Sequence, residues 1–480
     1  MKLGFMLQLL SKFAFAVSAV IMHVYLGRVL KVDDYGLVGI ILNLMNINYL
    51  FLSNGIRQSV SMFVSRQLYS WGDLVRKSAM FQLGIGALLF TLNYYGSWII
   101  AGLLGDHSME KYIKQTAFII PITAVHFLCI GVLNGEQRFG SESGMTILYS
   151  VLRLVCIPLL LLFPAADKLT LVINGLVFAV FSSSILGLVC LFTRHNRLEV
   201  KAHIGFDELA RKSLALIFFY AGITLLMNVD TILLKRITSD DQVVGYYTAA
   251  SSFSKIIYFI SVALISVITP VISKKYHGGD KLAANALFLK GIDFFMLVLA
   301  PVFIILAASG RHLFALLYSK TYEAAGGAFA VLVPAIFLLS VVVYLNTVVH
   351  AVSTVKNAAI SFALLGVNVV LNILLVPILG ALGTGLSLLV PSMLGCMAMM
   401  GPVQRVMGIK VEVMRMYRHT CLISVVAVVA TIVYQYINFT NIYWLFFSYV
   451  LLAGLSIIAM KLLGLIRKDM YDFLYIMRAN

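Results

Sequence analysis

Apolar stretches long enough to cross a membrane recur along almost the whole of this 480-residue chain. A transmembrane helix needs about 20 consecutive apolar residues, and no polar segment between the stretches exceeds roughly that length. Hydrophobic residues make up 61% of the chain and charged residues 12%, with a mean hydropathy of +0.97. A water-soluble globule cannot expose such a composition. The sequence therefore predicts an all-α integral membrane protein.

The hydropathy pattern predicts about 14 transmembrane helices. The first six are expected near residues 3–26, 36–56, 78–104, 112–134, 143–164 and 169–193. The next six are expected near residues 213–234, 244–270, 282–308, 324–352, 357–379 and 381–402. Two more, near 419–437 and 442–466, complete the set. The first stretch lacks a small-residue cleavage signal, so we expect a retained helix and not a removed signal peptide.

Basic residues indicate how these helices are oriented. With a cytoplasmic N-terminus, Lys and Arg of the cytoplasmic segments outnumber those of the outside loops more than twofold. This bias predicts that both termini are cytoplasmic. Contact of these residues with anionic lipid headgroups explains most of the net charge of +16, so no nucleic-acid partner is expected. All five cysteines fall in apolar stretches, which favours small core residues over disulfides or metal ligands.

Two loops indicate an internal repeat. Both the segment Leu26–Gly36 and the segment Leu234–Gly245 contain a basic residue followed by an Asp-Asp pair. Chance similarity between two short acidic loops is the alternative explanation. A repeat at this distance spans six helices, and an even number of helices gives both copies the same orientation. We therefore expect two parallel six-helix lobes around a central cavity, at 1–200 and 201–404, and two additional C-terminal helices at 405–480.

Four cations lie within the predicted helices, namely Lys12, Arg153, Lys255 and Lys290. A charge at the bilayer centre costs about 2.5–3.5 kcal/mol on insertion scales, so such residues usually face a protein interior or a watery cavity. Few acids lie at a comparable depth to neutralise them. This imbalance predicts an anionic ligand.

Four segments resemble a known transporter superfamily. They read GRVLKVDDYGLVGIILNLMNI at 27–47, NGIRQSVSMFVSRQL at 54–68, NVDTILLKRITSDDQVVGYYTAASSFSKI at 228–256 and VNVVLNILLVPILGALGTGLSLLV at 367–390. These segments cover both predicted lobes. On them the chain resembles the multidrug/oligosaccharidyl-lipid/polysaccharide exporter superfamily, and within it the polysaccharide (O-antigen type) flippases.

The resemblance implies translocation of an undecaprenyl-diphosphate-linked oligosaccharide repeat unit across the bacterial plasma membrane by alternating access. The product would serve the synthesis of O-antigen, capsule or exopolysaccharide. The resemblance implies no chemistry on the substrate and no cofactor, with a polysaccharide polymerase and chain-length proteins as partners. A lipid II (peptidoglycan precursor) flippase is the nearest alternative. A multidrug exporter of the same fold is a further one, although it would need acids in its cavity.

A membrane-embedded polysaccharide polymerase or ligase is the alternative outside the transporters. Such an enzyme acts on the same lipid-linked substrate and usually carries its reactive residues on a substantial external loop. The outside loops here are short and contain only scattered acids, and the sequence has no P-loop, HExxH or GxSxG motif. The sequence therefore favours a transporter.

The residues expected to bind the cargo diphosphate are Arg153, Lys255, Lys12, Arg57 and Lys290. A guanidinium presents a planar fork that matches two phosphate oxygens. Structural alternatives stay open for three of them: an interhelical ion pair for Arg153, snorkelling to the headgroups for Lys12, and a topological anchor for Arg57. Lys290 lies three residues from Asp293 and the two charges can neutralise each other.

A weaker set of residues is expected to couple transport to Na⁺ or H⁺, namely Asp230, Asp293, Asn368 and Asn372. Carboxylate and amide oxygens are the ligands that hard cations prefer, and the two asparagines are four residues apart on one helix face. Asp230 can equally be a capping or packing residue. His126 and His350 are expected to be hydrogen-bonded core residues, and Tyr246, Tyr247 and Tyr258 are the aromatic residues expected near a sugar.

Overall fold

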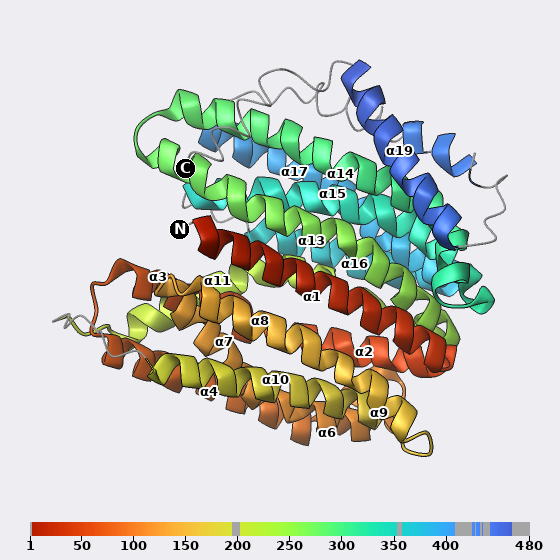
Figure 1. Cartoon of the computed structure of the whole chain (residues 1–480), viewed down its shortest axis with the longest axis horizontal. Coiled ribbons are helices and arrows are strands. Elements are labelled where there is room, and N and C mark those ends of the chain that lie inside the picture. Colours follow the sequence, from red (N-terminus) through yellow and green to blue (C-terminus); the bar gives the residue numbers. More distant parts are fainter. Residues whose placement is uncertain are drawn as a thin grey trace. The chain divides into compact units, whose positions relative to one another are not determined.

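Helices form every regular element of the described chain. The computed structural model describes residues 2–193, 202–352, 358–408, 425–427, 429–432, 434 and 442–462. Its contacts divide the chain into two units, Met1–Gly245 and Tyr246–Asn480. Helix α13 (Asp241–His277) runs from the first unit into the second (Figure 1).

The number of membrane-spanning helices agrees with the prediction for the first twelve. Within the described residues, 11 helices are long and apolar enough to cross a membrane, or 12 if the bent pair α4 and α5 forms one span. The helix expected at 419–437 falls mostly outside the described residues. The last expected helix corresponds to α19 (Ile442–Leu462), with a shorter apolar stretch at Tyr443–Ile458. The total of 14 stays a prediction.

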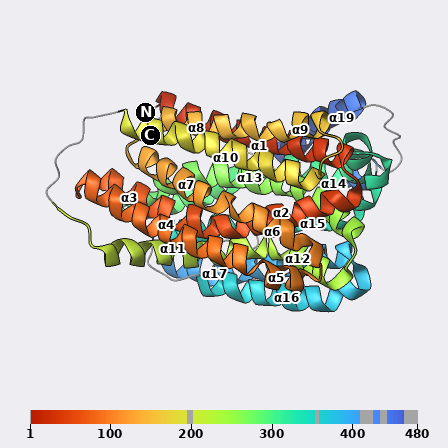
Figure 2. The same cartoon turned by 90° about the horizontal axis from the view of Figure 1, so that it is seen from below.

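The first unit is a helical bundle in which α10 packs on α7 and α8, α4 packs on α7, and α1 packs on α8. Figures 1 and 2 show α8 beside both α1 and α10. Its elements, besides the start of α13, are α1 (Lys2–Val29), α2 (Val32–Tyr49), η1 (Leu50–Arg57), α3 (Gln58–Arg66), α4 (Trp71–Tyr95), α5 (Ser97–Leu104), η2 (His107–Met109), α6 (Glu110–Ala117), α7 (Ile119–Gly135), α8 (Phe139–Leu152), η3 (Arg153–Val155), α9 (Cys156–Leu162), α10 (Lys168–Phe192), α11 (Phe206–Leu226) and α12 (Val229–Thr238).

Helix α10 buries some of its apolar residues and exposes others. Leu176 and Val180 are buried, whereas Phe178, Phe181 and Ile185 are about half exposed. A helix that is apolar on all sides is either fully buried or in contact with lipid. The exposed aromatic face of α10 is therefore the face that meets the acyl chains.

Several predicted helices of the first unit are interrupted. The helix expected at 36–56 extends to Arg66 through the π-helix η1, and the one at 78–104 bends by 62° next to Gly96. Pro158 follows the 3-10 turn η3; it lacks an N–H and its ring displaces the carbonyl of Leu154, which disrupts regular α-helix there. The helix at 213–234 breaks between α11 and α12, at Asn228.

The second unit packs around α15, which contacts α14 and α17 and buries residues on all sides. Its other elements are the remainder of α13, α14 (Lys281–Leu317), η4 (Lys320–Ala324), α15 (Ala325–Val352), α16 (Ala358–Leu379), α17 (Ala381–Met407) and α19. Helix α14 contains Pro301 and a non-helical Gly310 with φ +28°. Helix α16 has one exposed apolar face and one buried face that carries its two asparagines.

Candidate functional site

The five cations expected to bind cargo are divided between the two units. Lys12, Arg57 and Arg153 lie in the first unit, on α1, η1 and η3. Lys255 and Lys290 lie in the second unit, on α13 and α14, and both are half-buried. The contacts around the first three show which of them have donors left for a ligand.

Arg57 is the last residue of η1, and close helix contacts fix the backbone there. A Cβ at Gly55 would lie 2.3 Å from a side chain of α11, and one at Gly131 of α7 would lie 2.8 Å from the Arg57 carbonyl oxygen. The fully buried Gln82 of α4 donates to the Leu52 carbonyl at 3.1 Å. π-Turns within helices are frequent at functional sites. The backbone that carries Arg57 is thus held by three neighbouring helices.

The Arg57 guanidinium uses few of its donors on the protein. Its Nε donates to the Ser53 carbonyl at 3.3 Å, and its centre lies 6.0 Å from the Phe127 ring. Within the described ranges, its two terminal nitrogens have no hydrogen-bond partner and no carboxylate in ion-pair contact. A guanidinium carries five N–H donors. Arg57 can therefore offer a bidentate fork to a phosphate group.

Glu142 is an acid that acts electrostatically on two of these cations, and it is not among the site residues predicted from the sequence. It lies in the first turn of α8, is 8% exposed, and accepts a hydrogen bond from Gln8 of α1 at 2.5 Å. It interacts electrostatically with both Lys12 and Arg57. Acids at helix starts are common, so nothing in the sequence marks this one as buried. Two cations and one carboxylate form this cluster.

Arg153 is buried and engaged by the protein itself. Its Nε donates to the Ser18 hydroxyl at 2.9 Å, and its Nη2 donates to the Ser18 hydroxyl and to the Phe15 carbonyl. The guanidinium also lies 4.4 Å from the centre of the Phe15 ring and 5.6 Å from that of Tyr149. No acid lies in ion-pair contact with it in the described chain. Arg153 fastens η3 to α1, one turn from Lys12, and a direct role in cargo binding stays a prediction.

Replacing Arg153 with lysine should destabilise the first unit. A lysine keeps the charge but not the planar fork that reaches both Ser18 and the Phe15 carbonyl, nor the stacking on two rings. We expect a loss of about 2 kcal/mol, the value of a charged hydrogen bond, seen as a lower melting temperature of the detergent-purified protein. Arg76→Lys, at an exposed position of α4, is the control. An unchanged melting temperature for Arg153→Lys would contradict this assignment.

Asp230 lies in the first turn of α12, where the interrupted helix restarts. It is 2% exposed, and a carboxylate at this position complements the positive end of the helix dipole. On neighbouring positions, Asn228 accepts from Asn46 of α2 and Thr231 accepts from Asn43, both at 3.3 Å. These contacts support the packing and capping alternative for Asp230. Its role in ion coupling stays a prediction.

Asn368 and Asn372 are brought together on the buried face of α16. Asn368 donates to the Ser387 carbonyl of α17 at 2.9 Å, and Asn372 donates to the Asn368 carbonyl at 2.9 Å. Both side chains are fully buried. The bond from Asn368 to Ser387 holds α16 against α17. Asp230 belongs to the first unit, so a cation site shared with these two asparagines stays a prediction.

Lys290 and Asp293 lie one turn apart on α14, and both are half-buried. Asp293 interacts electrostatically with Tyr344 of α15, whose hydroxyl donates to the Phe288 carbonyl at 3.1 Å. The structure therefore places Asp293 beside a buried tyrosine. Its pairing with Lys290 and its role in ion coupling both stay predictions.

The candidate histidines and tyrosines lie mainly in aromatic clusters. His126 is buried, and its ring centre lies 5.5 Å from that of Phe127 and 6.1 Å from that of Tyr149. Tyr246 packs edge-on against Tyr322, and Tyr258 lies beside its chain neighbour Phe259. Tyr247 is buried and His350 is half-buried. Contact of any of these tyrosines with a sugar stays a prediction.

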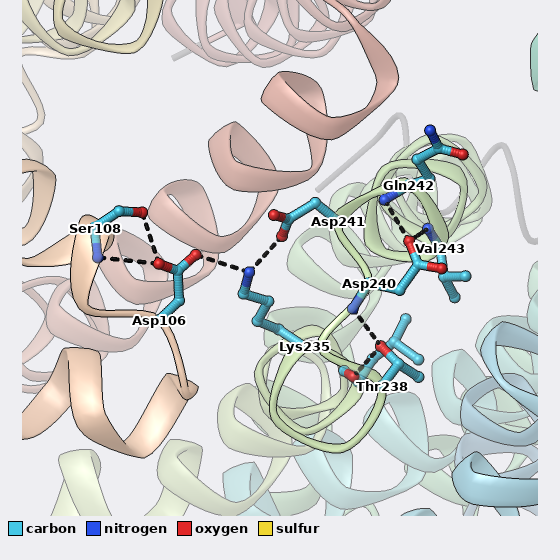
Figure 3. A network of polar contacts seen from close by, with 9 residues as sticks. Asp106, Ser108, Lys235, Thr238, Asp240, Asp241, Gln242 and Val243 are labelled. Carbon is cyan, nitrogen blue, oxygen red and sulfur yellow. Dashed lines mark hydrogen bonds and ion pairs between the residues drawn. The ribbon is translucent and has the colours of Figure 1, made fainter.

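A second charged cluster joins the loop after α5 to the start of α13. Lys235 of α12, with a side chain only 5% exposed, lies 2.8 Å from an Asp106 oxygen and 2.5 Å from an Asp241 oxygen. Figure 3 shows its amine between the two carboxylates. Backbones meet closely nearby, since a Cβ at Gly36 of α2 would lie 2.4 Å from the Asp241 carbonyl oxygen. The repeat in the sequence includes the pair Asp240-Asp241, but nothing in the sequence indicates that Asp106 lies close to it.

A pocket of about 630 Å³ opens in the first unit where α3 ends and α11 begins. Its charged lining consists of Arg66, Asp207, Glu208, Arg211 and Lys212. Because acids and bases are nearly balanced, this pocket shows little preference for an anion. Among the described residues, no group of three or more His, Cys, Asp or Glu side chains is placed to hold a metal ion.

Comparison with protein families decides what kind of chain this is. A family described as polysaccharide biosynthesis protein matches residues 3–275, which is more than half of the chain. The chain belongs to this family. A search of curated proteins found no match for this polysaccharide biosynthesis protein.

Solved structures share the fold of this polysaccharide biosynthesis protein. The lipid II flippase MurJ in an inward closed conformation aligns with a TM-score of 0.74 and 14% identity, over 95% of this chain and 98% of that chain. An inward-facing multidrug resistance MATE family transporter of the MOP superfamily aligns with a TM-score of 0.66 and 12% identity, over 84% of this chain and 98% of that chain. At such identities the likeness shows the fold alone.

A third similar structure concerns the polarity of the binding pocket. It is a MOP superfamily transporter from Pyrococcus furiosus, whose pocket is described as having reverse polarity that suggests a different function. It aligns with a TM-score of 0.61 and 12% identity, over 84% of this chain and 94% of that chain. The resemblance drawn from the sequence motifs is confirmed. This polysaccharide biosynthesis protein is a multi-pass helical membrane protein with the MOP transporter fold.

Proposed function

We propose that this protein is a flippase that moves an undecaprenyl-diphosphate-linked oligosaccharide repeat unit from the cytoplasmic to the outer leaflet of a bacterial plasma membrane. The observation that carries the proposal is Arg57, a half-buried guanidinium on a fixed backbone whose terminal donors have no protein partner in the described chain. Lys12 adds a second positive charge nearby. Together they suit a diphosphate headgroup, while the lipid tail stays in the bilayer.

The second unit would supply further cations, Lys255 and Lys290, when two lobes face each other around a central cavity. Rocking of one lobe against the other would then expose the site to either side of the membrane. Both termini are proposed to be cytoplasmic, with a polysaccharide polymerase and chain-length proteins receiving the cargo outside. Coupling to Na⁺ or H⁺ is proposed through Asp230 or Asp293, although Asn228 and Thr231 beside Asp230 accept hydrogen bonds from α2 that suit a packing role.

A lipid II flippase is the second candidate, because the lipid II flippase MurJ aligns over nearly the whole of both chains. Its cargo carries the same diphosphate, so the cationic cluster does not distinguish the two. A multidrug exporter fits less well, since cationic drugs would be repelled by Arg57 and Lys12. The family description favours polysaccharide over peptidoglycan.

Deletion of the gene in its own host tests the proposal. We expect loss of surface polysaccharide and accumulation of lipid-linked repeat units that face the cytoplasm, restored by the wild-type gene. Growth and peptidoglycan content should stay normal. Accumulation of lipid II would instead establish the second candidate. Accumulation of repeat units on the outer leaflet would refute a flippase and indicate a polymerase or ligase.

A further inference from the structure

We propose that Glu142 is the internal counter-ion of the cargo site, which offsets part of the positive charge of Lys12 and Arg57 when the site is empty and competes with the diphosphate when cargo binds. The inference rests on the proposed function, because it assigns a role to an acid beside the same two cations. It goes further by naming the residue that sets how tightly the site holds its anion.

Glu142 interacts with residues of two other elements. Its carboxylate lies at the start of α8, is held by the Gln8 amide of α1 at 2.5 Å, and interacts with cations of α1 and η1. A buried carboxylate is costly unless charges or hydrogen bonds compensate it. One neutral hydrogen bond does not suffice. Lys12, one turn after Gln8 on α1, and Arg57 act on this carboxylate electrostatically.

The two cations act on Glu142 without touching it. Structural ion pairs elsewhere in this unit are direct, as between Lys77 and Asp73 at 3.0 Å. In contrast, neither Lys12 nor Arg57 makes an ion-pair contact with Glu142 or another acid among the described residues. The Lys12 ammonium has no hydrogen bond there either. Both cations therefore keep donors for an anion while Glu142 lowers the net charge that this anion meets.

Glu142 differs from an ordinary acid at a helix start in its burial. Asp207 and Glu208 occupy the first turn of α11, where acids complement the helix dipole, and both are exposed. Glu142 occupies the same place on α8 but is buried. Capping alone does not require burial against two cations. Moderating the affinity of the site does, because a transported anion must bind and also leave.

Binding of inorganic pyrophosphate to the full-length protein in detergent tests the inference by calorimetry. Glu142→Gln keeps the hydrogen bond to Gln8 and removes the charge, so we expect binding about tenfold tighter than wild type, as for the loss of one like charge at moderate distance. Glu142→Asp keeps the charge and should stay within about threefold of wild type. Glu110→Gln, in a surface pair with Lys114, makes the same change of net charge and should leave binding unchanged.

A second variant covers the case in which Glu142→Gln fails to fold. Gln8→Leu removes the donor that holds Glu142 and leaves the carboxylate free to contact the cations, so pyrophosphate binding should weaken several-fold. Unchanged or weaker binding by a folded Glu142→Gln, or unchanged binding by Gln8→Leu, would overturn the inference. So would the absence of binding by wild type. None of these outcomes refutes the proposed function, which is tested separately by measuring lipid-linked intermediates in cells.

Discussion

Cells that carry Arg57→Ala should lose most of their surface polysaccharide while the protein stays in the membrane at its normal level. The contacts that fix position 57 are made by its backbone against Gly131 and within η1, and alanine preserves them. What alanine removes is a guanidinium whose terminal donors are free of protein partners among the described residues. The variant thus separates ligand binding from folding.

The size of the expected effect follows from the strength of the contact. A hydrogen bond to a charged group contributes about 1.5–3 kcal/mol, so loss of the fork should reduce transport by roughly 10- to 100-fold. Arg57→Lys keeps a point charge and should retain intermediate activity. Arg66→Ala removes an exposed arginine from the same long helix and is the matched control. The measurements are surface polymer and lipid-linked repeat units in the complemented deletion strain.

Normal polymer from Arg57→Ala would contradict the assignment of Arg57 to the cargo path. Loss of polymer together with loss of the protein would point to folding instead. If Arg66→Ala were equally impaired, the effect would come from positive charge in general at this end of the helix. Only a specific loss at position 57 with a normal amount of protein supports the proposed site.

The helices could be predicted from the sequence because the membrane imposes one rule on all of them. A span must be apolar for about 20 residues, and this pattern is visible without any partner. The interruptions were harder to foresee. Pro158 explains the 3-10 turn η3 once the structure is known. No proline or repeated glycine marks the π-helix η1, which depends on contacts from α7, α11 and Gln82.

The candidate site could be predicted only in part, since the sequence shows which charges are rare but not which of them meet. Arg153 was expected inside a predicted helix and Arg57 just after one, and both were expected to bind the cargo. The structure separates them, because Ser18 and the Phe15 carbonyl engage Arg153 whereas the Arg57 fork has no such partners in the described chain. The role of Glu142 could not be predicted, because its interactions come from residues more than 80 positions away and because acids at helix starts are usually exposed.

The second large effect is expected for Lys235→Met, which should strongly destabilise the protein. Removal of Lys235 leaves Asp106 and Asp241, with side chains 19% and 28% exposed, facing each other without a counter-charge. Removing one partner of a buried ion pair costs about 3–5 kcal/mol. We expect the melting temperature in detergent to fall by at least about 5 °C. Lys114→Met breaks the exposed pair with Glu110 and should cost under about 1 kcal/mol.

A neutral cluster should recover most of this loss. In the triple variant Lys235→Met, Asp106→Asn, Asp241→Asn no unpaired charge remains, and replacing all members of a buried charge cluster is often nearly neutral. Recovery would show that the cost of Lys235→Met comes from stranded carboxylates. A triple variant as unstable as Lys235→Met would show instead that the cluster stabilises the start of α13 through its hydrogen bonds.

The pH dependence gives an independent check on the same cluster. Burial acts to raise the pKa of Asp106, but hydrogen bonds from Lys235 and Ser108 outweigh it, and the pKa lies below its ordinary value. A carboxyl whose pKa is lowered by folding stabilises the fold at pH values above its unfolded pKa of about 3.9. This stabilisation is lost as the pH falls through the pKa of the folded state. The wild-type melting temperature should therefore be insensitive to Asp106 from pH 8 to pH 5 and drop below about pH 4. In Lys235→Met, protonation relieves the repulsion between the two acids, so its deficit relative to wild type should shrink over the same acidic range; a deficit independent of pH would contradict the electrostatic explanation.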